Sequence, residues 1–247
     1  MLTADSTTAD GVTSITSKWT KRQFVRSGRS VMRFRLDSKA MLAAVGGCVI
    51  VSLPCIHFSV KEREIIKKYG FVTFPEFIDN HYIKYKRAQV SFLVKCIKKY
   101  DVKFAIAPDY QYDSALILKR LYPDVEWIFP LHRKSEKEIA EHFDWVGFPH
   151  REHFRDYSLE WFLSNFEHKK RWYLGFWKES NPSVLLAFDG FDTTLPETYS
   201  GKYGKIWLSW NKSVKPEKPM RTIEIFEINV QNFKREVERL ELIKKLR

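Results

Sequence analysis

Short apolar runs rich in β-forming residues alternate in this sequence with longer stretches whose apolar residues recur at helical spacing. Each parallel strand needs a crossover to reach the next one, so strands and helices alternating in this way predict a parallel sheet. Seven or eight such units in 247 residues favour closure into a single (β/α)8 TIM-type barrel, an α/β fold. We expect strands at Cys48–Leu53, Phe71–Phe74, Val102–Ala107, Val125–Phe129, Trp145–Phe148, Trp172–Phe176 and Leu185–Phe191.

The eighth strand has two candidates, Ile206–Trp210 and Thr222–Ile228. Five amphipathic helices are expected between the strands, and sequences typical of helix starts occur at Ser59–Glu62, Ser135–Glu138 and Ser158. A charged helix at Val230–Arg247 is expected to pack on the barrel wall. No G-x-G-x-x-G follows the first strand, so a dinucleotide-binding fold is disfavoured.

The chain divides into a flexible basic arm at 1–40 and a barrel with its C-terminal helix at 41–247. The first 25 residues are rich in Thr, Ser and Asp and show no periodicity. The apolar stretch Met41–Ile56 is shorter than a spanning helix and contains Gly46, Gly47 and Pro54, so no membrane partner is expected. A basic cluster precedes the first strand and consists of Arg26, Arg29, Arg33 and Arg35.

A formal net charge of +12 favours a polyanionic partner, although a solvated basic surface is an alternative. The three cysteines, Cys48, Cys55 and Cys96, form no C-x-x-C pair. Their odd number and loose spacing argue against disulfides and structural zinc, which indicates a reducing, cytoplasmic location. No H-x-H, H-E-x-x-H or G-x-S-x-G pattern occurs, so we expect neither a metal nor another cofactor.

Polar residues follow most of the predicted strands, and active sites of such barrels lie at the carboxyl ends of the strands. Carboxylates, His-Arg pairs and aromatics at one mouth would suit an anionic substrate with a flat ring. Alternatives remain open: Asp109 may serve only as a helix N-cap, His132 and His150 as ordinary strand-end histidines, and Asp189 as a turn former. The residues expected at this mouth are Asp109, Tyr110, His132, Arg133, His150, Arg151, Trp177, Asp189 and Asp192.

The segment Phe188–Trp210, F-D-G-F-D-T-T-L-P-E-T-Y-S-G-K-Y-G-K-I-W-L-S-W, resembles the tRNA-guanine transglycosylase superfamily. Its F-D-x-x-L-P core is similar to the family's motif around the nucleophilic aspartate. Three shorter segments, at 107–110, 145–148 and 173–175, resemble family segments in the same order, so the resemblance covers roughly residues 100–210. The family's D-S-G-G-F-Q motif, its V-Q-G segment and its zinc-binding cysteines are missing. In this the chain looks more like the shortened branch, often found in phages and mobile elements, that inserts deazapurines into DNA.

The resemblance implies an enzyme that replaces guanine by a 7-deazapurine in DNA or tRNA through an aspartate glycosyl intermediate. Asp192 would be the nucleophile, and Asp109 would contact or protonate the purine. The partners would be nucleic acid and a free deazapurine base. The implied substrate contacts are Tyr110, His132, Arg133, Gly147, Phe148, His150, Arg151, Trp177 and Asp189, with Arg26, Arg29, Arg33 and Arg35 on backbone phosphates.

Two other functions remain open from the sequence. The missing motifs favour a catalytically degenerate barrel that acts as a basic nucleic-acid-binding protein. A barrel enzyme that acts on a small phosphorylated substrate is the third hypothesis.

Overall fold

The computed structural model describes residues 50–53, 58–176, 181–210 and 212–246, which belong to one compact unit beginning at Gly47. The predicted arm, including Arg26, Arg29, Arg33 and Arg35, lies outside the described residues.

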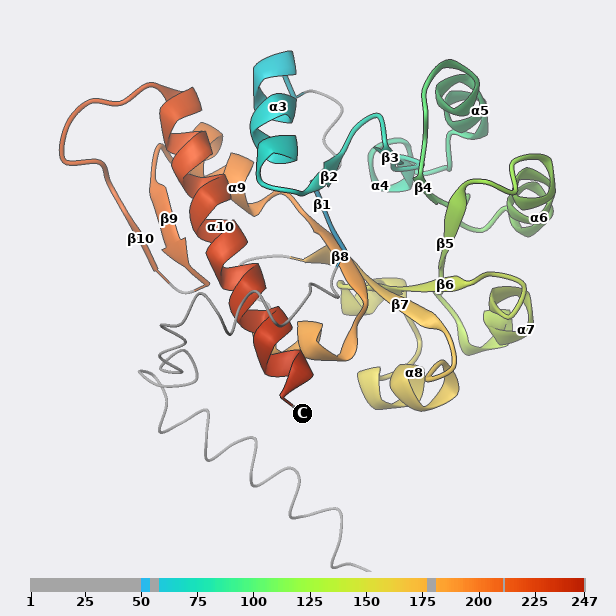
Figure 1. Cartoon of the computed structure of the whole chain (residues 1–247). Coiled ribbons are helices and arrows are strands. Elements are labelled where there is room, and N and C mark those ends of the chain that lie inside the picture. The colour runs from blue at the N-terminus through green and yellow to red at the C-terminus, as the bar shows by residue number, and fades with distance from the viewer. Residues whose placement is uncertain (1–49, 54–57, 177–180, 211, 247) are drawn as a thin grey trace, which may run out of the picture. The chain divides into compact units, whose positions relative to one another are not determined.

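Eight strands form one parallel sheet in the order β2-β1-β8-β7-β6-β5-β4-β3 (Figure 1). The strands are short, as the apolar runs predict. Their bounds are β1 Ile50–Leu53, β2 Val72–Thr73, β3 Phe77–Ile78, β4 Phe104–Ile106, β5 Glu126–Pro130, β6 Trp145–Pro149, β7 Lys170–Phe176 and β8 Gly190–Thr193.

Helices connect the strands and lie outside the sheet in Figure 1. Ser59 caps the first of them in a capping box with Glu62, and the Ser158 side chain accepts from the N–H of Trp161, so both predicted helix starts are confirmed. Ser135 instead lies inside a short 3-10 helix, Lys134–Glu136. The α-helices are α3 Val60–Lys68, α4 Tyr82–Tyr85, α5 Val90–Lys99, α6 Tyr112–Leu121, α7 Lys137–Ala140, α8 Leu159–Asn165, α9 Leu195–Glu197 and α10 Thr222–Lys245.

The sheet curls strongly, as a contact between β3 and β7 demonstrates. Four strand spacings separate these two strands, which in a flat sheet would place them roughly 19 Å apart. The ring centroids of Phe77 on β3 and Trp172 on β7 lie 5.4 Å apart and the rings are stacked. No hydrogen-bonded pairing joins β2 to β3, the two edge strands of this sheet. The structure therefore shows a curled parallel sheet, and the predicted closed (β/α)8 barrel is not confirmed.

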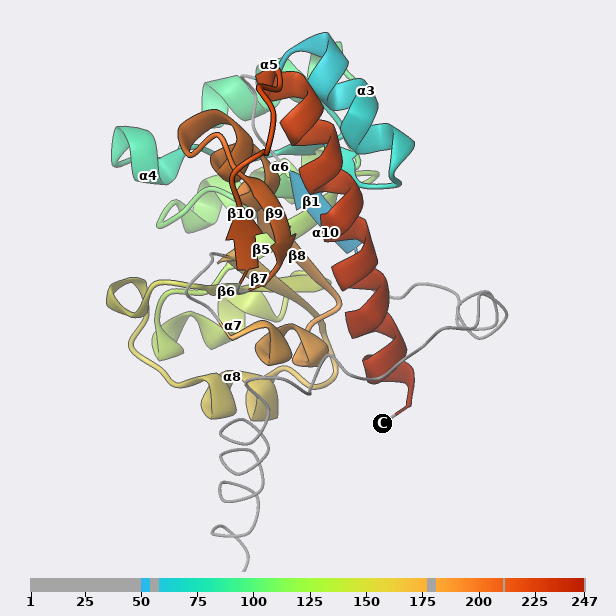
Figure 2. The same cartoon turned by 90° about the vertical axis from the view of Figure 1, so that its left-hand side faces the viewer.

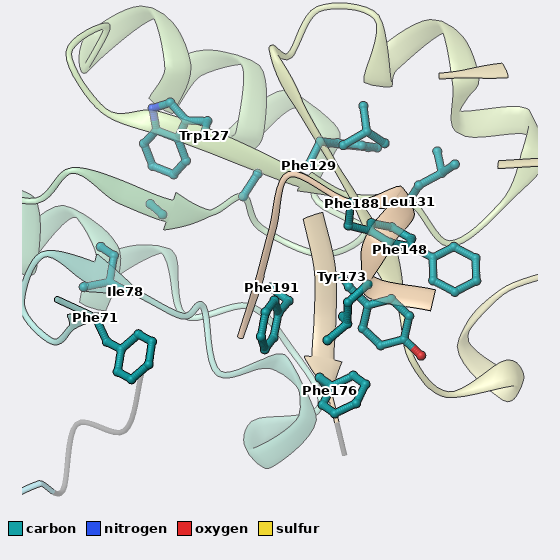
Figure 3. Close-up of a cluster of buried hydrophobic side chains, with 14 of the residues drawn as sticks. Phe71, Ile78, Trp127, Phe129, Leu131, Phe148, Tyr173, Phe176, Phe188 and Phe191 are labelled. Atoms are coloured by element: carbon teal, nitrogen blue, oxygen red, sulfur yellow. The ribbon is translucent and has the colours of Figure 1, made fainter. Parts of the chain in front are cut away.

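Side chains from alternate strand positions form two separate cores. The inner face of the curl holds a small cluster that includes Phe77, Ile106, Ile128, Trp145 and Trp172. The outer face, under the helices, holds the larger core, part of which is drawn in Figure 3. This division follows from the two-residue period of a strand, and it decides which strand residues can reach a site inside the curl.

Three of the sequence expectations for strands are wrong. Leu185–Phe191 is not one strand, because Pro182–Ala187 forms a 3-10 helix and β8 begins only at Gly190. Neither candidate for the eighth strand joins the sheet. Ile206–Ser209 (β9) pairs antiparallel with Lys212–Val214 (β10) in a separate sheet, and Thr222–Ile228 is the start of α10. The eighth strand is β3, whose two residues are too few to give a periodic pattern.

The predicted C-terminal helix is confirmed and begins eight residues earlier than expected. Figure 2 shows α10 running alongside the sheet, with the β9–β10 hairpin beside it. Asn229 of α10 is fully buried and ties the hairpin down: its Oδ1 accepts from the N–H of Trp207, and its Nδ2 donates to the carbonyls of Pro196 and Lys205. Among the described residues, no helix is both long and apolar enough to cross a membrane.

Candidate active site

A cavity of about 310 Å³ opens at the carboxyl ends of the strands. Its walls come from the residues that follow β3, β4, β5 and β6, and from the ends of β7 and β8. Three carboxylates and two imidazoles line it: Asp79, Asp109, Asp192, His132 and His150. This cavity therefore lies at the carboxyl ends of the strands, where the sequence predicts a site.

Asp192 lies on β8 and points to the inner face of the curl. The indole Nε1 of Trp172 donates to its Oδ1 at 2.9 Å, and the N–H of Gly175 donates to its Oδ2 at 3.0 Å. Gly175 has a φ of +73°, in the left-handed region, and the register between β7 and β8 shifts between Tyr173 and Phe176. This irregularity turns a backbone N–H that would otherwise serve the ladder toward the carboxylate.

The pKa of Asp192 is raised to about 7. Burial is the largest cause, and the negative charge of Asp79 adds to it, while the hydrogen bonds from Trp172 and Gly175 oppose the rise. The carboxyl is thus close to half ionised at neutral pH. A group with this property at a cavity is a candidate for chemistry.

Asp79 follows β3 directly and lines the same cavity. Its Oδ1 accepts from the N–H of His81 at 3.1 Å. Burial raises the pKa of Asp79, the nearby His81 opposes the rise, and the charge of Asp109 adds to it. Asp79 is therefore close enough to both other carboxylates to interact with them: the charge of Asp109 raises the pKa of Asp79, and the charge of Asp79 raises the pKa of Asp192.

Asp109 and His132 form a buried pair at the ends of β4 and β5. The Nε2 of His132 lies 2.5 Å from Oδ1 of Asp109, and its Nδ1 lies 2.9 Å from the carbonyl oxygen of Phe154. A carbonyl can only accept, so Nδ1 carries a proton, and Nε2 shares a second one with Asp109. Burial lowers the pKa of His132, but the hydrogen bond and the charge of Asp109 outweigh it and the pKa is raised overall.

Asn80 completes this pair. Its Nδ2 donates to Oδ2 of Asp109 at 2.5 Å and to the carbonyl of Ala107 at 2.6 Å. The Asp109 side chain is thus engaged on both oxygens and does not cap α6, whose N-cap is Gln111. The alternative that Asp109 is only a helix cap is therefore wrong.

An aromatic stack rises from the pair toward the solvent. The Tyr110 ring stacks on His132 with centroids 4.4 Å apart and planes 17° apart, and Tyr82 lies 5.2 Å from Tyr110. Tyr110 has a φ of +57° and is 37% exposed. This left-handed backbone is unusual for a bulky residue, and here it accompanies a stack of Tyr110 over the buried imidazole.

Two further predicted residues line the cavity. His150 follows β6, and its Nδ1 lies 3.1 Å from the hydroxyl of Tyr173. Arg151 is exposed at the rim and offers a guanidinium to an anionic group. A carboxylate near its ionisation point, a shared proton and a rim cation together can attack an electrophilic carbon, protonate a leaving group and hold an anion.

Several predicted residues do not line the cavity, and Tyr110, in the stack over His132, is one of them. Phe148 points to the outer face, where it packs on Phe162, so it cannot sandwich a substrate ring inside the curl. Gly147 faces inward but is covered by the Leu174 side chain. A Cβ added at Gly147 would come 2.7 Å from the Leu174 Cδ1. Arg133 is exposed and lies outside the lining, although it neighbours His132.

The prediction that Asp189 lies at the cavity, near the carboxyl end of the seventh strand, is wrong. Asp189 precedes β8 and so lies at the opposite end of that strand from the cavity. Its Oδ1 accepts from Lys244 Nζ at 2.8 Å, and its Oδ2 accepts from the N–H of Arg171 at 3.0 Å. These contacts fasten α10 to the sheet. Trp177 lies outside the described residues.

Sequence reasoning missed Asp79, Asn80 and Tyr82 as site residues, although all three line the cavity. They follow a strand of only two residues, which is too short to be recognised as an apolar run. The residues after it were therefore not considered as strand-end residues. The signal that was available is the D-N-H-Y segment between two amphipathic patterns. No cluster of three or more His, Cys, Asp or Glu suited to a metal occurs in the part of the chain that the structure describes.

Comparisons with known proteins do not show a family. No family model matches the chain. The uncharacterized protein ORF192 of Acidianus two-tailed virus is 28% identical over 135 residues, which cover 51% of this chain and 70% of the viral protein. A thiamine phosphate pyrophosphorylase from Pyrococcus furiosus superposes with a TM-score of 0.38 and 14% identity, over 80% of this chain and 87% of its own.

Proposed function

We propose that this chain is a base-exchange enzyme that acts on nucleic acid and replaces guanine by a 7-deazapurine through a glycosyl intermediate on Asp192. The observation that supports this most is the setting of Asp192. It lies at a cavity, held by two N–H donors from Trp172 and Gly175, with a pKa of about 7. A carboxylate held in this way is suited to attack an anomeric carbon and to be released again.

The reaction would begin with attack by the Asp192 carboxylate on the anomeric carbon of the target nucleotide. The bond from that carbon to the purine nitrogen breaks, and its electron pair leaves with the purine. The leaving purine takes up a proton, and the proton shared by Asp109 and His132 is the available source. The carboxylate ester formed on Asp192 then holds the nucleic acid for the second half.

The second half reverses these steps with a different base. A ring nitrogen of the incoming deazapurine attacks the anomeric carbon, the ester bond breaks, and Asp192 regains its negative charge. The incoming base loses its proton to the Asp109–His132 pair, which restores the starting state. When ionised, Asp79 beside Asp192 would stabilise the positive charge that develops on the sugar in both halves.

The size of the cavity is consistent with this proposal. A volume of about 310 Å³ lies at the low end for sites that take small molecules and leaves no room for stacked neighbours. The target base would therefore have to leave its stack to enter. The stacked Tyr110 and His132 would form one side of the entrance.

The test is an exchange assay with labelled guanine on single-stranded DNA, duplex DNA and tRNA. We expect Asp192→Asn to abolish exchange while salt-dependent binding of polynucleotide is kept, because the change removes one charge inside a cavity. Asp189→Asn is the matched control and should keep exchange, since Asp189 lies at the other end of β8. Binding without exchange by the native protein on all three polymers would instead favour the degenerate nucleic-acid-binding alternative.

A further inference from the structure

The segment Ile83–Arg87 begins at the cavity and continues away from its lining. Its five consecutive residues are all exposed, with Ile83 at 56% and Tyr85 at 51%. Ile83 and the preceding Tyr82 line the cavity itself. Exposed apolar side chains next to a cavity offer additional contact area to a ligand that enters it.

The cations of this segment have no acidic partner in the part of the chain that the structure describes. None of Lys84, Lys86 and Arg87 forms an ion pair with any described residue. Three unpaired positive charges in four residues form a strong local attraction for an anion. The segment therefore combines charge for phosphates with flat or apolar surface for bases.

Further cations extend this surface around the mouth. Arg133 and Arg151 follow β5 and β6, whose carboxyl ends meet at the same edge, and both are exposed. The acidic residues nearby are engaged locally: Glu152 lies 3.7 Å from Arg155, and Asp156 accepts from the backbone N–H of Lys134. Tyr110 stands between the two groups of cations, at the end of β4.

The backbone holds the segment outward. His81 and Lys86, on either side of α4, have φ values of +59° and +57°, which non-glycine residues seldom adopt. The N–H groups of His81 and Tyr82 are held by the side chains of Asp79 and Asn80. Figure 2 shows α4 standing clear of the sheet on the side away from α10.

We propose that Ile83–Arg87, together with Tyr110, Arg133 and Arg151, is a docking surface for single-stranded nucleic acid that flanks the base in the cavity. This rests on the proposed function and names its substrate class. In a duplex the base faces are stacked and paired, so only phosphates and groove edges can contact such a surface. Ile83 and Tyr85 would then remain exposed to solvent. Unstacked bases expose flat faces that can cover both, while the cations bind the phosphates between them.

The test measures binding of a labelled oligonucleotide, single-stranded or as the same sequence in duplex form, over a series of salt concentrations. In the triple variant Lys84→Gln/Lys86→Gln/Arg87→Gln, single-strand affinity should fall at least tenfold and the salt slope should drop by about 2. Tyr85→Ala should weaken single-strand binding roughly five- to hundredfold with the salt slope unchanged. The matched control is Lys95→Gln/Lys98→Gln/Lys99→Gln on α5, three exposed cations away from the mouth, which should change little.

Equal effects of the two triple variants, or duplex bound as tightly as single strand, would overturn the docking surface. The outcome is separable from that of the proposed function. Tight single-strand binding that depends on Tyr85, without any base exchange, would support the docking surface and contradict the proposed base-exchange activity. Base exchange with the same KM for polynucleotide in the Lys84/Lys86/Arg87 variant as in the native protein would support the enzyme and contradict the docking surface.

Discussion

The backbone N–H of Gly175 donates to Oδ2 of Asp192 at 3.0 Å, from a residue whose φ of +73° lies in the left-handed region. This bond joins an irregularity of β7 to the carboxylate that we assign as the nucleophile. The chain around Asp192 is arranged to hold a charge that burial disfavours.

Gly175→Ala should lower both stability and exchange. A Cβ at Gly175 meets no atom within 4 Å, so the cost of about 1 kcal/mol in unfolding free energy comes from the backbone conformation. If the backbone relaxes, its N–H leaves Asp192. Gly204→Ala is the control, because Gly204 has a φ of +56° and equally open surroundings. Denaturation and exchange assays should show similar losses of stability, with exchange reduced only in Gly175→Ala; equal exchange in both would contradict the role of this N–H.

Trp172→Phe should move the pH dependence of exchange upward. The indole hydrogen bond lowers the pKa of Asp192, so without it the pKa should rise further above about 7. A nucleophile must be ionised, and the rising limb of the rate profile should therefore shift to higher pH. Trp145→Phe removes a similar inner indole, whose Nε1 donates to Glu126 at 2.7 Å, and should leave the limb in place. An unshifted limb in Trp172→Phe would count against Asp192 as the titrating group.

Asp109→Asn should lower the pKa of His132. In the native protein the pair with Asp109 raises this pKa above 6.5 despite burial, so the charged His132 contributes stability below pH 6.5 that is lost as pH rises through the raised value. The variant should lose this pH window and roughly 2–3 kcal/mol at low pH. NMR titration of the His132 ring, with unfolding measured at pH 5 and pH 8, checks both. A His132 pKa unchanged by the substitution would show that Asp109 does not control the shared proton.

The fold was predictable where the sequence pattern is long. Parallel strands β4 to β7 lie close to their expected bounds because each is an apolar run flanked by a helical pattern. Two-residue β3 has no such pattern. The structure places it by parallel pairing with β4 and by the stacking of Phe77 on Trp172. The end of the 3-10 helix Pro182–Ala187 resembles a strand in the sequence, because its apolar residues pack against α10 as those of a buried strand would.

The sequence predicts which strand ends contribute residues to the site. It does not predict which side chains contact one another there. Asp109, His132, His150 and Asp192 all line the cavity, since each follows or ends a strand that was recognised. Phe148 could not be excluded in advance: both faces of a parallel strand are buried, so the sequence does not tell which residues face the inner side. Asp189 was misplaced because the start of β8 was expected five residues too early.

The central claim is that Asp192 forms a covalent bond to the sugar of the nucleic acid. The most direct measurement is mass spectrometry of the peptide that contains Asp192, after the protein has reacted with a guanine-containing oligonucleotide and the reaction has been stopped by acid denaturation. We expect that peptide to carry the mass of the oligonucleotide without its guanine base, and Asp192→Asn to carry none. Active exchange with no adduct on Asp192, or an adduct that persists in Asp192→Asn, would contradict the account.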